Sequence, residues 1–316
     1  MSWLIRAKKA LASRQLFDNW YSLLASYALT KVGFNVRLKA RINDFILDIL
    51  PETYRHLINW YYEGLIKDLE CRSGKVFLNG VEVSDINELL NNYNSEKLAE
   101  VFGWKYDSLC NCWTKNNIRI RHMREAVLRT FDFSIFKDLS VNGRVVVDVG
   151  AYIGDSAIYF ALRGARKVIA IEPHPGAYEE MLENIRLNSI ETTIFPINAG
   201  LASRPGKILL EEVDIETTFV TYHRPNDQKG TIPAVTLRDL IREFNLNGAV
   251  LKMNCEGCEY DVILNDYEHV KTFKELLFQY HASAKPLLKK LSEDFTCEIV
   301  NRDYRLVKCI NIDPSL

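Results

Sequence analysis

The hydrophobic residues in the second half of the chain form short unbroken runs that alternate with amphipathic stretches. Residues 145–149 and 168–171 are runs rich in β-branched residues, which are typical of strands buried on both faces of a parallel sheet. Between them, residues 156–162 place apolar side chains at helical spacing, and Gly164 ends that helix. The succession of strand, helix and strand predicts a βαβ unit and therefore an α/β fold.

The same alternation continues to the end of the chain. Helices are predicted over residues 177–187, 236–244, 260–265 and 286–291, and strands over 193–197, 250–254 and 275–280. Two final strands, at 296–300 and 306–310, are expected to form an antiparallel pair at the sheet edge. The prediction is a Rossmann-like, doubly wound and mostly parallel sheet with an antiparallel edge strand.

The first half of the chain has a different pattern. Residues 1–32 form an amphipathic helical stretch that is basic, and residues 33–123 form an α+β appendage with a hairpin signal at Asn79-Gly80. The large domain then occupies residues 124–316, with a β-rich insertion at 201–235. Loops at the carboxyl edge of a parallel sheet bind ligands. We therefore expect His223 and Arg224 of this insertion to contact an acceptor substrate.

Two partners fit the basic stretch at residues 1–32. One is the surface of an anionic membrane, and the other, which we favour, is the large domain at residues 124–316 or a second subunit. The net charge is −1, from 40 basic and 41 acidic residues, which argues against nucleic acid as a partner. The sequence contains neither a long apolar run nor a secretory signal, so we expect a cytoplasmic protein. The alternative is a cytoplasmic protein that associates with a membrane.

Seven cysteines, an odd number, favour free thiols over a disulfide framework. Four of them could form a zinc site, but a packing role explains them better, because cysteine is a small residue that suits a buried position at a strand end. These four are Cys110, Cys112, Cys255 and Cys258.

Candidate chemistry begins at the turn after the first strand of the βαβ unit. Gly150 and Gly154 mark this turn, and Glu172 ends the second strand, where an acid can bind the two hydroxyls of a ribose. A dinucleotide fingerprint would need glycine at positions 152 and 155, which are Tyr152 and Asp155 here. S-adenosylmethionine therefore fits the turn better than NAD, and an NAD-dependent oxidoreductase is the less favoured alternative.

With these residues in view, the sequence resembles the FkbM-type family of S-adenosylmethionine-dependent methyltransferases, over about residues 144 to 310. The resemblance rests on four blocks: residues 147–151 with Gly154; residues 171–173 with Asn184 and Asn188; residues 251–259; and residues 280–281. It implies a class I methyltransferase fold and an O-methyltransferase acting on hydroxyls of sugars, glycans, glycolipids or related metabolites. Cofactor contacts are then expected from Asp148, Gly150, Ala151, Tyr152, Gly154, Asp155, Glu172, Pro173 and Asn198.

The strand ends also supply the candidate catalytic residues. We expect Glu256 to stand beside the reacting hydroxyl, Lys252 to pair with Glu256 or hold the acceptor, and a neutral His281 to accept a proton. Asn254 stands where the family has an aspartate, and Gln279 where it usually has an acid. The missing carboxylates make a metal site less favourable and suggest an alternative function, a catalytically weakened scaffold that binds the cofactor or a partner.

Overall fold

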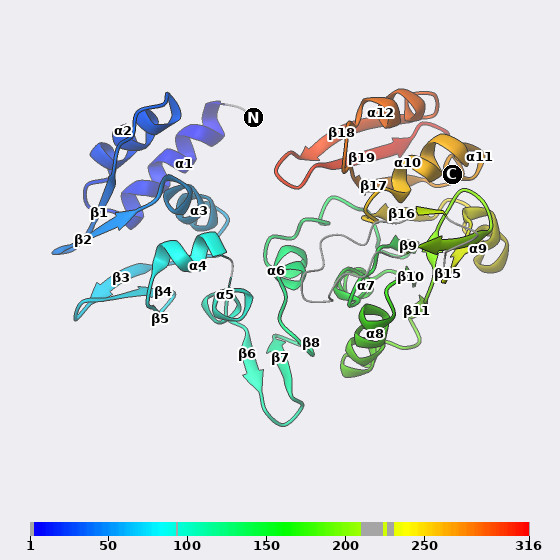
Figure 1. The fold of residues 1–316 in the computed structure, drawn as a ribbon, viewed down its shortest axis with the longest axis horizontal. Helices are drawn as coiled ribbons and strands as arrows, with labels where there is room; N and C mark the ends of the chain where they lie inside the picture. The colour runs from blue at the N-terminus through cyan, green and yellow to red at the C-terminus, as the bar shows by residue number, and fades with distance from the viewer. Residues whose placement is uncertain (1–2, 93, 210–223, 226–230, 316) are drawn as a thin grey trace. The chain divides into compact units, whose positions relative to one another are not determined.

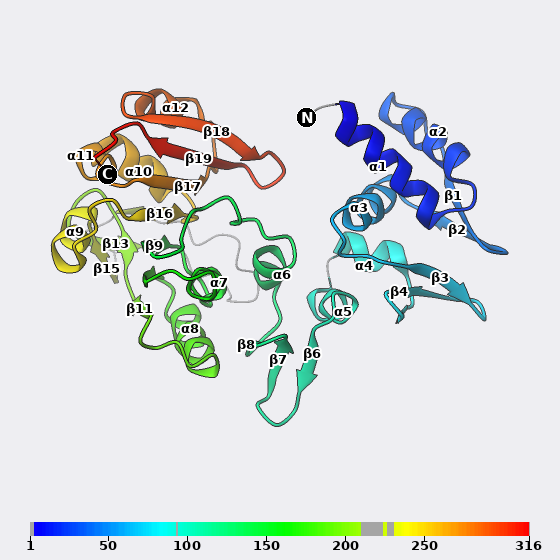
Figure 2. The same cartoon turned by 180° about the vertical axis from the view of Figure 1, so that it is seen from behind.

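The computed structural model describes residues 3–92, 94–209, 224–225 and 231–315. The chain divides into two compact units, shown from opposite sides in Figures 1 and 2. Unit 1 comprises Met1–Asn116 and His122–Leu128, and unit 2 comprises Asn117–Arg121 and Arg129–Leu316. The domain boundary expected at residues 123/124 lies inside the second segment of unit 1.

Unit 2 is built on a seven-stranded sheet with the order β11-β10-β9-β16-β17-β19-β18. The first five strands run parallel to one another, whereas β19 runs antiparallel to both β17 and β18. The predicted fold class is confirmed, with one refinement: the antiparallel strand lies one place inside the edge. The strands are β9 (Val145–Val149), β10 (Lys167–Ile171), β11 (Ile194–Ile197), β16 (Val250–Met253), β17 (Glu275–Gln279), β18 (Phe295–Asn301) and β19 (Leu306–Asn311).

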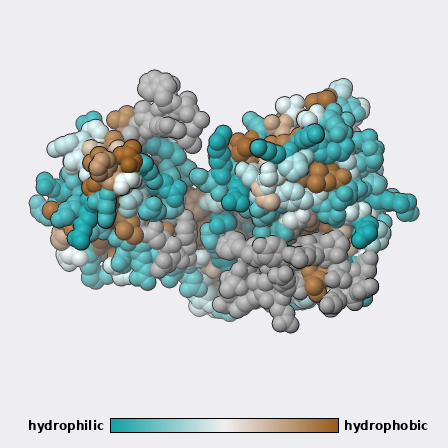
Figure 3. All heavy atoms as spheres, turned by 45° about the horizontal axis from the view of Figure 1, so that its top comes forward, coloured by the Kyte–Doolittle hydropathy of each residue, from teal (hydrophilic) through white to brown (hydrophobic). Residues whose placement is uncertain are grey.

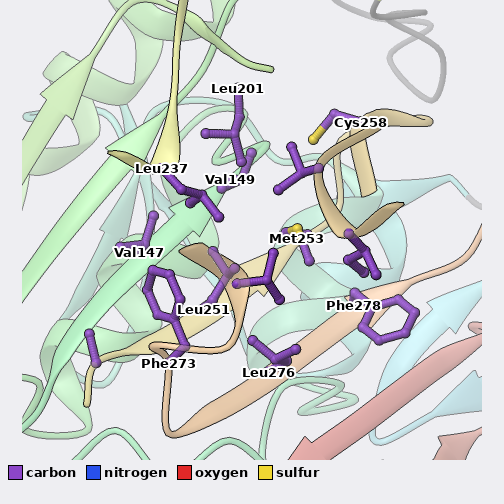
Figure 4. Packing of buried hydrophobic residues seen from close by; sticks show 14 of the residues in the cluster. Val147, Val149, Leu201, Leu237, Leu251, Met253, Cys258, Phe273, Leu276 and Phe278 are labelled. Carbon is purple, nitrogen blue, oxygen red and sulfur yellow. The ribbon is translucent and has the colours of Figure 1, made fainter. Parts of the chain in front are cut away.

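Helices connect these strands and cover both faces of the sheet. They are α7 (Asp155–Leu162), α8 (Pro175–Leu187), α9 (Leu237–Phe244), α10 (Cys258–Asn265), α11 (Tyr267–Val270) and α12 (Lys285–Leu291). Helix α6 (Glu125–Phe131) precedes β9 and contains the boundary between the two units. Alternate residues of β9 point to opposite faces, as in any strand. Val147 and Val149 join the core under α9, α10 and α12, while Asp148 bonds Ser156 of α7. Figure 4 shows this core, where Leu251 and Phe278 converge with Val147 and Val149.

The β-rich insertion expected at residues 201–235 contains a small second sheet in its described part, with the strand order β12-β15-β13-β14. Its strands are β12 (Gly200–Leu201), β13 (Gly206–Leu209), β14 (Arg224–Pro225) and β15 (Ile232–Val235). The proposed acceptor residue His223 lies outside the described residues, and Arg224 belongs to β14.

Unit 1 combines helices with three groups of short strands. The helices are α1 (Trp3–Leu16), α2 (Trp20–Lys31), α3 (Pro51–Tyr62), α4 (Ile86–Asn92) and α5 (Ser95–Val101). The strands up to the start of unit 2 are β1 (Leu38–Ile42), β2 (Phe45–Ile49), β3 (Leu69–Arg72), β4 (Lys75–Leu78), β5 (Val81–Val83), β6 (Lys105–Asp107) and β7 (Cys112–Lys115), and β8 (Ile118–Ile120) opens unit 2. Asn79 and Gly80 both have positive φ and close the antiparallel hairpin between β4 and β5, which confirms the hairpin signal.

Residues 3–31 form two helices, α1 and α2, rather than one. The side chain of Asn19 accepts a hydrogen bond from the backbone of Arg41 and donates one to Lys39, both at 2.8 Å, which ties the break to β1. Within unit 1, α1 packs on α3, where the hydroxyl of Tyr54 donates to Ser13 at 3.0 Å. Among the described residues, every helix is too short or too polar to cross a bilayer.

Six of the seven cysteines form disulfides, so the expectation of free thiols was wrong for all except Cys71. The pairs are Cys110–Cys112, Cys255–Cys258 and Cys297–Cys309. Neighbouring strands explain the third pair, because Cys297 of β18 lies directly opposite Cys309 of β19. Local turns bring the members of the other two pairs together, and parity alone could not show this.

Candidate functional site

The turn after β9 lies against the end of β16. Gly150 has a φ of +71°, and a Cβ atom at this position would lie 1.9 Å from the backbone oxygen of Asn254. The backbone amide of Asn254 donates in turn to the carbonyl of Val149 at 3.0 Å. Only glycine fits this close approach, so the turn and the loop after β16 form one packed surface.

Helix α8 supports the other end of the turn. Gly154 caps α7 with a φ of +84°, and a Cβ there would lie 2.8 Å from the Cγ of Met181. The buried amide of Asn184 donates to the carbonyl of Ile153 at 2.9 Å. Two residues of α8 therefore fix the backbone between Gly150 and Gly154.

Glu172 stands at the carboxyl end of β10 and reaches toward this turn. One carboxylate oxygen accepts from the backbone amide of Tyr152 and the other from that of His174, each at 2.8 Å. Burial raises the pKa of Glu172 to about 7, although these two hydrogen bonds oppose the shift. The side chain of Asn198, after β11, donates to the backbone carbonyl oxygens of Glu172 at 2.9 Å and Pro173 at 3.3 Å. These two bonds fix the backbone that carries the Glu172 carboxylate.

Lys252 is completely enclosed by the turn and by β9. Its ammonium lies 2.8 Å from a carboxylate oxygen of Asp148 and donates to the carbonyl of Gly150 at 2.9 Å. The second oxygen of Asp148 accepts from the hydroxyl of Ser156 at 2.7 Å. The partner of Lys252 is therefore Asp148 and not Glu256, so the expected pairing with Glu256 was wrong; these contacts fix the glycine turn.

Asp155 begins α7 and is also buried. Its carboxylate accepts a hydrogen bond from the hydroxyl of Thr130. Burial raises the pKa of Asp155 to about 6, and the hydrogen bond from Thr130 offsets part of that rise. The side chain is thus held inside the protein between α6 and α7. Ala151, at the start of the turn, is buried and donates its backbone amide to Ile171 at 3.1 Å.

The loops after β16 and β17 bring a histidine between two carboxylates. The Nδ1 atom of His281 lies 2.8 Å from Glu259, and its Nε2 atom lies 3.2 Å from Glu256. Burial would lower the pKa of His281, but the contacts with Glu256 and Glu259 outweigh it and raise the pKa to about 9. At neutral pH this histidine is an imidazolium ion, whereas the sequence suggested a neutral ring.

Tyr260, next to Glu259 on α10, holds the backbone around His281. Its hydroxyl accepts from the amide of Ala282 at 2.9 Å and donates to the carbonyl of Ser283 at 3.2 Å. The two neighbouring residues of α10 therefore fix both the ring of His281 and the loop that carries it.

Asn254, between Lys252 and Glu256, has a buried side-chain oxygen that accepts no hydrogen bond from any described residue. A buried acceptor without a donor is costly in a folded protein. This oxygen is therefore suited to a hydrogen-bond donor of a bound ligand.

The structure brings the predicted residues to one edge of the sheet, at the carboxyl ends of β9, β10, β11, β16 and β17. Several supporting residues had no assigned role, among them Ser156, Asn184, Glu259 and Tyr260. The sequence held a signal for Glu259, because Glu256 and Glu259 are three residues apart across a glycine. Nothing in the sequence indicated that both would contact one histidine.

Comparisons with known proteins find methyltransferases in several groups. The chain is 37% identical over 87 residues to protein arginine N-methyltransferase 6 of Danio rerio, covering 27% of this chain and 24% of that protein. It is 30% identical over 134 residues to the tRNA (guanine(37)-N(1))-methyltransferase Trm5b of Methanocaldococcus jannaschii, covering 42% and 34%. The chain thus spans only a quarter to a third of the length of these relatives.

Among solved structures, a methyltransferase FkbM from Methylobacillus flagellatus KT is similar, with a TM-score of 0.42 and 17% identity. The similarity covers 59% of this chain and 48% of that one. A family model, the methyltransferase FkbM domain, matches residues 148–306, from Asp148 of β9 to the start of β19. Because this match covers just over half of the chain, the protein belongs to the FkbM family of S-adenosylmethionine-dependent methyltransferases.

Proposed function

We propose that this protein transfers the methyl group of S-adenosylmethionine to a hydroxyl group of a sugar, glycan, glycolipid or related metabolite. The observation that carries the proposal is the cluster of Glu256, His281 and Glu259 at the sheet edge that also holds the glycine turn. An oxygen nucleophile must lose its proton as it gains a methyl group, and this cluster offers a carboxylate for that proton.

The residues around Glu172 fit the nucleoside part of the cofactor. Each carboxylate oxygen uses one lone pair on a backbone amide, which leaves acceptor capacity for ribose hydroxyls. Asn198 and Pro173 support the position of the acid, and Asn198 borders the place expected for the adenine. The glycine turn, with Gly150, brings the backbone close to the methionine part without a side chain in the way.

The free side-chain oxygen of Asn254 fits a donor on the ligand, either the ammonium of the cofactor or the acceptor hydroxyl. An amide in place of a carboxylate keeps this acceptor while removing a negative charge. Asn254 is therefore a ligand-binding residue in this proposal, and the site has no need of a metal ion there.

When bound, S-adenosylmethionine supplies a methyl group already activated by a positively charged sulfur. Glu256 accepts the hydroxyl proton of the acceptor, and the imidazolium of His281, 3.2 Å away, orients the Glu256 carboxylate. Glu259 and Tyr260 are positioning residues, because they act through His281 and its loop. Alignment supplies most of the acceleration, and Glu256 is expected to add about 10²-fold to 10⁴-fold.

A second candidate function is a scaffold that binds the cofactor or a partner without efficient catalysis. It is favoured by Asn254 and Gln279, where the family places carboxylates. The variant Asn254→Asp separates the two ideas. A weakened enzyme gains methyl transfer in this variant, whereas a working enzyme changes little or loses activity.

The sequence favours packing of residues 1–32 on the large domain or on a second subunit; as the alternative, we propose a peripheral membrane contact that brings a cytoplasmic enzyme to a glycolipid acceptor. The exposed residues of α1 and α2 include Arg14 and Lys31 as well as the apolar Leu11 and Tyr21. Hydrophobic residues form separate patches among hydrophilic ones on the face shown in Figure 3. Sedimentation with anionic and neutral vesicles tests the contact, and equal binding of a Leu11→Ser/Tyr21→Ser variant would argue against it.

Calorimetric titration with S-adenosylhomocysteine, on the wild type and on Glu172→Ala, tests the cofactor site. Binding in the wild type that the variant loses supports the ribose contact. Transfer of labelled methyl groups then compares sugar and lipid-linked glycan acceptors with tRNA and with arginine-containing peptides. The last two are included because similar proteins are named as tRNA and protein arginine methyltransferases. If only tRNA or only peptide is labelled, the proposal of a sugar or glycan hydroxyl as the acceptor is wrong.

A further inference from the structure

The disulfide between Cys255 and Cys258 lies within the family's motif. It closes a small ring around Glu256 and Gly257, directly after β16 and at the start of α10. The other two disulfides lie in unit 1 and between β18 and β19. Of the three pairs, this one alone encloses a residue that the proposed reaction uses.

The ring connects the two halves of the proposed site. On one side, the residue before it, Asn254, packs its backbone oxygen against Gly150 of the turn. On the other side, Glu256 contacts His281, and the backbone amide of Gly257 donates to Glu259 at 3.0 Å. A change in this ring therefore reaches the glycine turn and the histidine together.

Glu256 has an unusual backbone conformation for its residue type. Its φ is +50°, in the left-handed region that residues with a side chain adopt only when the surroundings enforce it. Gly257, with a φ of +116°, completes the reversal of the chain. A covalent link between the residues on either side of Glu256 and Gly257 is one such enforcement, and the Glu256 carboxylate lies 3.2 Å from His281.

The two sulfurs have different surroundings. Cys258 is almost completely buried and begins α10, whose amino terminus stabilises a thiolate. Cys255 is the more exposed of the two, at 9%, and its sulfur lies 3.6 Å from Glu259, whose negative charge disfavours a thiolate. This asymmetry suits thiol–disulfide exchange, with Cys255 as the sulfur that is attacked and Cys258 as the leaving group.

We propose that Cys255 and Cys258 form a thiol–disulfide exchange site that sets the position of Glu256 and thereby controls methyl transfer. The control of transfer rests on the function proposed above, whereas the exchange site itself does not. The disulfide form is the active form, because the closed ring holds Glu256 against His281. The dithiol form releases Glu256 from its left-handed conformation.

The exchange balances with a small-molecule disulfide such as oxidised glutathione. In the first step, the Cys255 thiolate attacks oxidised glutathione, forming a mixed disulfide and releasing one glutathione thiolate. In the second step, the Cys258 thiolate attacks the Cys255 sulfur of this mixed disulfide, forming the Cys255–Cys258 bond and releasing the second glutathione thiolate. Over both steps the two cysteines lose two electrons and two protons, and one oxidised glutathione becomes two thiols. Reduced glutathione runs the same steps in reverse.

The exchange site is measured without any methyl acceptor. Full-length protein is equilibrated in glutathione buffers of graded ratio, quenched with acid, alkylated, and analysed by peptide mass spectrometry. Residues 255 and 258 are expected to become alkylated together over one reversible transition. The site is rejected if they stay unmodified in the most reducing buffer or become alkylated in the most oxidising one.

The consequence for Glu256 has its own readout in the NMR titration of His281. The pKa of His281 is expected to be lower in the dithiol form, because Glu256 has moved away. Identical titrations in both forms would overturn the control of Glu256, whether or not an acceptor is known. Failure of S-adenosylhomocysteine to bind either form would instead reject the function proposed above.

Methyl transfer gives the final comparison. The dithiol form and the variant Cys255→Ser/Cys258→Ser are each expected to be slower by about 10-fold to 100-fold, the effect of a misplaced reacting group. The variant should no longer respond to the glutathione ratio. The matched control Cys297→Ser/Cys309→Ser removes a disulfide between β18 and β19, and its response should match that of the wild type. Equal rates for both redox forms of the wild type would overturn the control of transfer.

Discussion

The ammonium of Lys252 lies 2.8 Å from the carboxylate of Asp148, and both side chains are buried beneath the glycine turn. Removing one charge leaves the other without compensation in the interior. Lys252→Met is therefore expected to lower the free energy of unfolding by about 3–5 kcal/mol, measured by chemical denaturation. The double variant Lys252→Met/Asp148→Asn removes both charges and should recover part of that loss. Equal losses in the single and double variants would contradict this account.

The close approach of Gly150 to Asn254 predicts a specific effect of a single methyl group. Gly150→Ala would place a Cβ 1.9 Å from a backbone oxygen, so the turn must move and S-adenosylhomocysteine binding should fall by at least about 100-fold. Gly143→Ala is the matched control, because Gly143 has a φ of +72° but no atom within 4 Å of the added carbon. The control should lose about 1 kcal/mol of stability from backbone strain and keep its affinity. Calorimetric titration distinguishes the two variants.

The raised pKa of Glu172 predicts that cofactor affinity depends on pH. In the proposed complex, ribose hydroxyls donate to the ionised carboxylate, and a pKa of about 7 means that the carboxylate is largely protonated at pH 6. Affinity for S-adenosylhomocysteine should therefore be about tenfold higher at pH 8 than at pH 6. Glu172→Gln cannot ionise, and its affinity should stay flat over this range. A wild-type affinity that fell with rising pH would exclude the ribose contact proposed for Glu172.

The imidazolium of His281 predicts the alkaline limit of methyl transfer. The proposed reaction needs this group protonated, so kcat should fall as the pH rises through about 9. Glu259→Gln removes one of the two carboxylates that raise the pKa, and the alkaline limit should move to lower pH. A merely structural role for Glu259 would lower activity without moving this limit. The pH profile of kcat decides between the two.

Three raised pKa values predict how stability changes with pH when no cofactor is bound. Folding raises the pKa of Asp155 to about 6, that of Glu172 to about 7 and that of His281 to about 9. The folded state therefore binds more protons than the unfolded state from about pH 4 to 9, and its stability falls as pH rises through that window. Thermal unfolding should give a lower Tm at pH 9 than at pH 5. Glu172→Gln should flatten the part of the slope between pH 5 and 7.

Local patterns in the sequence were enough to predict most of unit 2. The β-branched run of residues 145–149 can be buried on both faces only in a parallel sheet, and β9 has these bounds in the structure. The positions of the helices in this unit could also be predicted from the sequence. An apolar face at helical spacing can be recognised without knowing which element the helix packs against. In unit 1, α4 and α5 are two separate helices, and the side chain of Asn94 caps the second one. A short polar break of this kind is hard to distinguish from a solvated helix face.

By itself, the sequence determined the βαβ unit, the glycine turn and the acid of Glu172, because each depends on residues close together in the chain. The tertiary structure decided which charges meet. Lys252 pairs with Asp148 of the neighbouring strand, and His281 lies between Glu256 and Glu259 across two loops. Such pairings follow from strand order and loop packing, which bring distant residues within 4 Å and remove them from water. Protonation states depend on the same packing, so the charged form of His281 and the disulfide around Glu256 became visible only in the folded chain.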